Sequence, residues 1–129
     1  MKIKLTTVYV DDQDKALRFY TEVLGFVKKA DFSQGPYRWL TVASAEEPDG
    51  VELQLARNDN PAAKEFQQAM FQQGIPLNAF EVSDLDAEFA RLRELGVVFT
   101  VEPTRAGPVR IAVFADTCGN LIQLYQPPD

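Results

Sequence analysis

The chain has 129 residues, 46% of them hydrophobic and 25% charged, a composition that excludes disorder as the main state and provides for one folded core. Its net charge of −6 argues against nucleic acid and anionic membranes as partners, and no apolar run reaches the roughly 18 residues of a membrane span. One cysteine excludes an intramolecular disulfide, and the absence of histidine excludes Ser-His-Asp and Cys-His catalysis.

The first part of the chain predicts a strand, a helix and three further strands. Apolar residues alternate over 3–10, which is typical of a strand, and Asp11 or Asp12 can cap the helix that follows. Gly25 gives that helix a C-terminal stop. The GPYRW and EEPDG turns then separate strands that we expect near 26–32, 37–43 and 50–56.

A linker helix separates this part from a second one with the same pattern. Asn-Asp-Asn-Pro at 58–61 opens a helix near 61–73, whose glutamines at 67–73 we expect to face solvent. The second part predicts a strand at 76–82 and a helix at 84–95, followed by strands near 97–101, 108–115 and 119–126.

The two parts form an internal repeat. Residues 8–26 align with residues 80–97, so that Asp12 matches Asp84 and Asp14 matches Asp86. The sequence therefore predicts an α+β fold with two βαβββ modules, at about 1–57 and 75–129, joined by a linker helix at about 58–74.

Three segments carry a more specific resemblance. They read DDQDKALRFYTEVLGF at 11–26, RWLTV at 38–42 and DTCGNLIQLYQP at 116–127. With the element order and the length, they resemble the glyoxalase/bleomycin-resistance/dioxygenase superfamily, also called vicinal oxygen chelate proteins, over nearly the whole chain. The resemblance implies a single domain over residues 1–129, in which two βαβββ modules form an incomplete barrel with a concave pocket. It also implies a symmetric homodimer.

The resemblance further implies where a divalent metal would be held, on the first and last strands of each module. These positions fall on Leu5, Glu52, Leu77 and Gln123. Leucine has no lone pair to donate, and a neutral glutamine carbonyl is a weak ligand for a transition metal. We therefore expect no metal site and no cofactor.

Glu52 is the candidate catalytic residue. In the functional interpretation its carboxylate acts as a general base or holds a substrate at the pocket floor. In the structural interpretation Arg38 or Arg110 neutralises it, or it is solvated at an open mouth. Cys118 is interpreted as a turn residue, because no histidine is present to activate its thiol.

Aromatic and amide side chains complete the candidate pocket. Trp39 is the strongest candidate for a ligand contact, because Leu40 and Val42 fit the core face better; packing in the core or a dimer interface is the alternative for each aromatic residue. The candidate ligand-binding residues are Leu5, Thr7, Tyr9, Trp39, Glu52, Gln54, Leu77, Gln123 and Tyr125.

These residues favour a metal-free protein that binds a small aromatic or amphipathic molecule in the barrel pocket, similar to the drug-sequestering bleomycin-resistance members of the family. An enzyme is the less favoured alternative: a glyoxalase-like lyase or dioxygenase with a degenerate metal site that uses Glu52 and Gln123. A third hypothesis is a dimeric accessory protein without a ligand. We expect a cytoplasmic location, because the apolar stretch after MKIKLTT is too short for a signal peptide.

Overall fold

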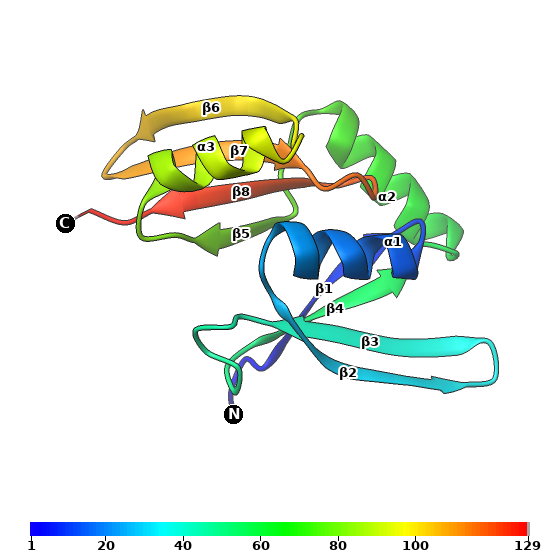
Figure 1. Ribbon diagram of the computed structural model, residues 1–129. Coiled ribbons are helices and arrows are strands. Elements are labelled where there is room, and N and C mark those ends of the chain that lie inside the picture. Colours follow the sequence, from blue (N-terminus) through cyan, green and yellow to red (C-terminus); the bar gives the residue numbers. More distant parts are fainter. Residues whose placement is uncertain (129) are drawn as a thin grey trace. The chain divides into compact units, whose positions relative to one another are not determined.

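The computed structural model describes residues 1–128 and contains two compact units, Met1–Phe66 and a second unit that begins at Gln67 (Figure 1). Each unit contains a four-stranded mixed sheet. Among the described residues no strand of one sheet pairs with a strand of the other, so the sheets are not closed into a barrel. The predicted α+β fold, with the βαβββ order occurring twice, is confirmed.

The sheet of the first unit has the strand order β1-β4-β3-β2. The strands are β1 (Leu5–Val10), β2 (Val27–Gln34), β3 (Tyr37–Ala43) and β4 (Glu52–Arg57). The parallel pairing of β1 with β4 requires a crossover, and α1 (Gln13–Arg18) lies in it. The core of this unit combines the buried helix residues Ala16 and Tyr20 with alternate strand residues that have almost no exposure: Val8, Val10, Leu40, Val42, Leu53 and Leu55.

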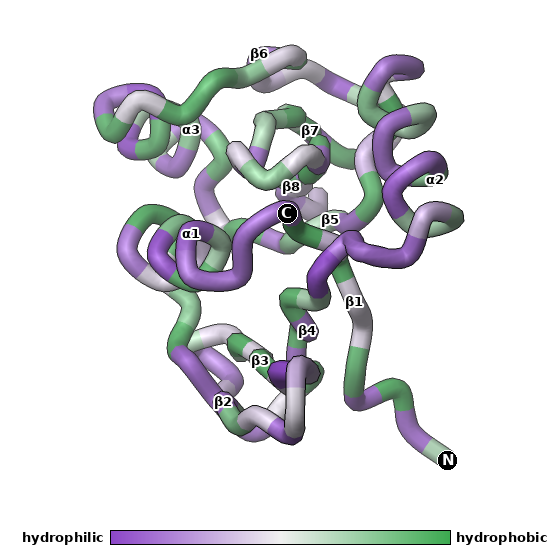
Figure 2. Tube along the Cα trace, turned by 90° about the vertical axis from the view of Figure 1, so that its right-hand side faces the viewer, coloured by the Kyte–Doolittle hydropathy of each residue, from purple (hydrophilic) through white to green (hydrophobic). Residues whose placement is uncertain are grey.

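The helix that begins at Gln13 does not continue as an ordinary α-helix. Its last five residues form a π-helical segment, η1 (Phe19–Val23), in which the Leu24 N–H donates to the Phe19 carbonyl. The Thr21 hydroxyl donates to the Leu17 carbonyl at 2.6 Å, and this side-chain bond competes for the backbone acceptor of the helix. Figure 2 shows hydrophobic and hydrophilic stretches alternating along α1, as an amphipathic helix requires.

The sheet of the second unit has the strand order β5-β8-β7-β6. The strands are β5 (Asn78–Glu81), β6 (Phe99–Ala106), β7 (Val109–Ala115) and β8 (Leu121–Gln126), and the helix after β5 is α3 (Leu85–Glu94). The helix α2 (Pro61–Gln72) precedes β5, and the boundary between the units falls within it. Strand β6 runs to Ala106, five residues beyond the predicted end, because it forms a long antiparallel pair with β7. No helix of residues 1–128 is long and apolar enough to span a membrane.

Each unit has the same type of helix cap and an equivalent ion pair. Asp12 accepts a hydrogen bond from the Lys15 N–H at the start of α1, and Asp84 accepts one from the Ala87 N–H at the start of α3. Asp14 pairs with Arg38 at 2.7 Å, and Asp86 pairs with Arg110 at 2.9 Å. The positions that the repeat aligned therefore have the same structural role in both units.

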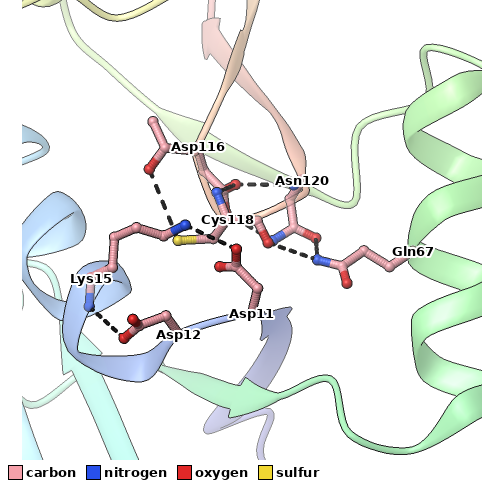
Figure 3. Close-up of polar contacts among 8 residues, drawn as sticks. Asp11, Asp12, Lys15, Gln67, Asp116, Cys118 and Asn120 are labelled. Carbon is pink, nitrogen blue, oxygen red and sulfur yellow. Dashed lines mark hydrogen bonds and ion pairs between the residues drawn. The ribbon is translucent and has the colours of Figure 1, made fainter.

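The prediction that the glutamines of α2 face solvent is wrong for Gln67, which is only 2% exposed. Its side-chain amide donates to the Cys118 carbonyl at 3.0 Å and to Asn120 Oδ1 at 3.1 Å (Figure 3). Asp116 in turn accepts from the backbone N–H groups of Cys118 and Asn120. Cys118 lies buried in the bend before β8, where the sequence placed a turn residue.

Gly119 lets α2 approach this bend closely. Its φ is +101°, and a Cβ there would lie 2.7 Å from Gln67 Nε2, whereas Gly107, at φ +62°, has no atom that a Cβ would meet within 4 Å.

We expect Gly107→Ala to lower the free energy of unfolding by about 1 kcal/mol, the cost of a left-handed backbone for alanine. Gly119→Ala adds the clash and should cost about 3 kcal/mol in all, measured by urea denaturation. Equal losses in the two variants would contradict the close approach of Gln67.

Candidate ligand-binding site

A chain of side-chain hydrogen bonds runs across three strands of the first unit. Thr7 in β1 and Thr41 in β3 are the partners of Gln54 in the sheet register. The Thr7 hydroxyl donates to Gln54 Oε1 at 3.0 Å, and Gln54 Nε2 donates to the Tyr37 hydroxyl at 3.3 Å. Gln54 is nearly buried, so the two bonds fix its amide between β1 and β3.

A pocket of about 400 Å³ lies beside this chain, at the end of the sheet where β1 and β4 finish and β3 begins. Its walls combine tyrosine rings, the three hydrogen-bonded side chains and charged groups: Thr7, Tyr9, Gln13, Pro36, Tyr37, Arg38, Gln54, Ala56, Arg57 and Asp59. All of these residues belong to the unit Met1–Phe66. The pocket walls, aromatic and polar, therefore come from one unit.

Glu52 lies two residues before Gln54 in the same strand, opposite Leu5, and is half-buried. The Thr41 hydroxyl donates to its Oε1 at 2.6 Å. The hypothesis that an arginine neutralises Glu52 is wrong, because Arg38 pairs with Asp31 and Asp14. In the second unit Arg110 likewise pairs with its own Asp86.

The charge of Arg38 is fixed by its two carboxylate partners. Its guanidinium donates to both oxygens of Asp31, at 2.9 and 3.0 Å, and to Asp14 at 2.7 Å. These bonds raise the pKa of Arg38 above its usual range, and the bond to Asp31 has the largest effect. In turn, the Arg38 guanidinium holds the pKa of Asp31 below its ordinary value of 3.8. Gln13 fixes the neighbouring backbone, since its amide donates to the Arg38 and Leu55 carbonyls. This wall of the pocket is therefore charged but held in place.

Trp39 lies outside the lining of the pocket, on the same strand as Tyr37 and one alternate position further along. Its ring stacks on Phe32 of β2 with centroids 6.4 Å apart, and it is half-buried. Leu40 and Val42 are fully buried, as the sequence predicted. Leu5 is 41% exposed at the start of β1 and also lies outside the pocket lining.

The remaining candidates lie in the second unit. Gln123 in β8 is opposite Ala79 in β5, just as Gln54 is opposite Thr7, so the counterpart of Gln123 in the first unit is Gln54 rather than Glu52. Leu77 precedes β5 and its N–H donates to the Leu121 carbonyl. Tyr125 is half-buried and pairs in register with Glu81.

The pocket thus contains three of the predicted residues, Thr7, Tyr9 and Gln54, and several that sequence reasoning missed. Tyr37 is the important omission in the pocket lining, and Thr41, which lies outside the lining, is the overlooked partner of Glu52. The alternation that placed Trp39 on one face of β3 also places Tyr37 and Thr41 there, so the signal was present. Gln13 was missed because it stands among charged residues at the start of α1, where a polar side chain is expected to face solvent.

A metal centre finds few ligands in these residues. Within residues 1–128 no three His, Cys, Asp or Glu side chains gather in one place. The carboxylates nearest the hydrogen-bonded chain already have partners, since Glu52 accepts from Thr41 and Asp59 in the pocket wall pairs with Arg57. The amide of Gln54 is bound on both sides. This donor set does not fit zinc or nickel, which take several His, Cys or carboxylate ligands.

The sheets, the crossover helices and the pocket define a glyoxalase-like protein. Residues 2–124 match the model of the Glyoxalase/Bleomycin resistance protein/Dioxygenase superfamily, and the chain belongs to this superfamily. The uncharacterized protein YurT of Bacillus subtilis (strain 168) is 55% identical to it, over 98% of this chain and 99% of that protein.

Two crystal structures show the same fold. UcmS2 is 35% identical, with a TM-score of 0.84 and coverage of 97% of both chains. TnmS3, an antibiotic binding protein from Streptomyces sp. CB03234, is 34% identical, with a TM-score of 0.78 and coverage of 98% of this chain and 96% of that one.

The Asp31–Arg38 pair gives this wall of the pocket a pH-dependent stability. Because the pKa of Asp31 is lowered in the folded protein, the pair stabilises the fold above pH 3.8, and this stabilisation is lost as the pH falls through the lowered pKa. We expect Asp31→Asn to lower the free energy of unfolding by about 1 kcal/mol at pH 7, and by progressively less under acid conditions. Urea denaturation from pH 7 down to pH 2 measures the difference.

The matched control is Asp49→Asn, which breaks the pair with Lys29 at 3.2 Å. The Asp49 side chain is 95% exposed, so this change should alter stability very little at any pH. A loss in Asp31→Asn that stays constant with pH would contradict the role of the ion pair.

Proposed function

We propose that this chain binds a small aromatic or amphipathic molecule, without a metal ion, in the pocket of the unit Met1–Phe66. One observation carries the proposal: a pocket of about 400 Å³ in which a fixed hydrogen-bonded chain lies beside tyrosine rings. Pockets for organic ligands have this size and combine apolar walls with a few placed polar groups.

The polar groups of the pocket are held before any ligand arrives. Thr7 and Tyr37 fix the amide of Gln54, and Asp31 and Asp14 fix the guanidinium of Arg38. Side chains that are already ordered lose little conformational freedom on binding, so more of the contact energy is expressed as affinity. This is the property required of a protein whose task is to hold a molecule.

Glu52 supports binding better than catalysis. It lies outside the residues that line the pocket, and its Oε1 accepts a hydrogen bond from Thr41. A lyase of the glyoxalase kind needs a Lewis acid as well as a base, because electrostatic stabilisation supplies much of the barrier reduction. A single carboxylate held by a threonine does not provide both.

The likeness to TnmS3 supports the same proposal, since that protein is described as an antibiotic binding protein and its fold covers 98% of this chain. The proposal takes the chain as a single superfamily domain that works as a cytoplasmic homodimer. Sequestration of a small molecule needs only a shaped cavity and no reactive group.

Proflavine, a planar cationic aromatic amine, is a suitable first probe of the pocket. We expect it to bind saturably, to quench the fluorescence of Trp39, and to bind Tyr9→Ala more weakly by ~1–3 kcal/mol, because the ring of Tyr9 lines the pocket. Fluorescence polarisation of proflavine itself gives the dissociation constants. Phe71→Ala, at an exposed aromatic residue of α2, is the matched control and should leave the affinity unchanged.

The competing hypothesis places Trp39 in a dimer interface. In that case Trp39→Ala yields monomers in sedimentation and proflavine titrations stay flat for every variant. Under the present proposal Trp39→Ala keeps its sedimentation behaviour and still binds proflavine. A dissociated mutant together with a flat titration would count against a ligand pocket on this face.

Metal content tests the proposal that the protein works without a metal ion. Protein purified without chelators should contain well under one equivalent of Zn, Ni, Fe or Mn, and EDTA should not change its Tm, because Leu5 and Leu77 offer no ligand atom. Elemental analysis of the wild type and of Glu52→Gln makes the measurement. One equivalent of metal in the wild type that is absent from Glu52→Gln would overturn the metal-free proposal.

A further inference from the structure

The hydrogen-bonded chain in the pocket has a direction. The Thr7 hydroxyl donates to the carbonyl oxygen of the Gln54 side chain, and the amide nitrogen of the same side chain donates to the Tyr37 hydroxyl. Tyr37 is therefore the acceptor at the end of the chain. A phenolic hydroxyl has one proton to donate, and no described residue accepts that proton from Tyr37.

Tyr37 is also the accessible end of the chain. It is 53% exposed, whereas Gln54 is nearly buried, and all three residues line the same pocket. A hydroxyl that already accepts one hydrogen bond becomes a stronger donor, because each bond in a chain polarises the next. The free proton of Tyr37 is thus both available to a ligand and strengthened by Gln54.

We infer that Tyr37 is a specificity-determining residue that selects planar ring systems carrying a hydrogen-bond acceptor, such as a ring carbonyl, over those carrying a donor. The inference rests on the proposed function, since it names the class of ligand that the same pocket takes. An N–H or O–H group directed at Tyr37 would meet an oxygen that already accepts from Gln54, so it would gain less than the bond to water that it loses.

Three tricyclic probes of nearly the same shape separate these cases. Fluorenone presents a carbonyl acceptor, carbazole presents an N–H donor, and fluorene presents neither. Equilibrium dialysis at pH 8 gives the three dissociation constants without a reporter group. We expect the wild type to bind fluorenone about fivefold more tightly than fluorene, the factor typical of one neutral hydrogen bond, and to bind carbazole no better than fluorene.

Two substitutions test the direction of the chain. Tyr37→Phe removes the donor and should bind fluorenone and fluorene equally. Gln54→Glu keeps the shape of the side chain but offers only acceptors when ionised, so Tyr37 must donate to it and turn its lone pairs to the ligand. This variant should therefore prefer carbazole to fluorenone. Thr7→Ser keeps the hydroxyl donor and should retain the wild-type order of the probes.

The outcomes separate this inference from the proposed function. If no probe binds the wild type, both fail. If all three bind with equal affinity, or if Tyr37→Phe keeps the preference for fluorenone, the pocket stands and the role of Tyr37 is overturned. A preference of the wild type for carbazole would show that Tyr37 donates to Gln54, which also overturns the inference. Should Gln54→Glu fail to fold, the comparison of the wild type with Tyr37→Phe still decides.

Discussion

An amide that is taken out of water must find hydrogen-bond partners, and the side chain of Gln54 finds them in two neighbouring strands. Thr7 of β1 and Tyr37 of β3 lie on either side of it, so the hydrogen-bonded side chains that line the pocket also link three strands of the sheet. Removal of either partner would leave a nearly buried donor or acceptor unpaired. The direction of the hydrogen-bonded chain, which ends at the Tyr37 hydroxyl, follows from this one constraint.

The same constraint operates in the second unit with a different result. Gln67 is buried there, and its amide is satisfied by the bend that carries Cys118 and Asn120. Asp116, fully buried, accepts three hydrogen bonds from this bend. These groups are paired with one another, so they tie α2 to the sheet. In the first unit, by contrast, the chain of hydrogen bonds ends at an exposed tyrosine, and this difference underlies the proposal that only the first cluster receives a ligand.

Local signals allowed the sequence to predict most of the fold. The caps Asp12 and Asp84 and the alternation of apolar residues depend on near neighbours, and both are where the repeat placed them. The site depends on pairings between strands, which a single sequence does not specify. From the sequence, Glu52 was matched with Gln123, whereas the strand register shows that the counterpart of Gln123 in the first unit is Gln54. The alternation along β3 placed Tyr37 on the same face as Trp39, but its hydrogen bond with Gln54 depends on the pairing of the strands.

The central claim is that the pocket beside Gln54 binds an aromatic molecule. A ligand titration monitored by two-dimensional ¹H–¹⁵N NMR tests it most directly, because the side-chain amide of Gln54 and the indole of Trp39 each give their own signal. Added fluorenone should shift the Gln54 side-chain signal saturably, together with backbone signals of β1, β3 and β4, and with one dissociation constant. Tyr37→Phe should weaken that constant without altering the unbound spectrum of the second unit. Saturable binding that leaves the Gln54 side-chain signal unmoved would contradict the account.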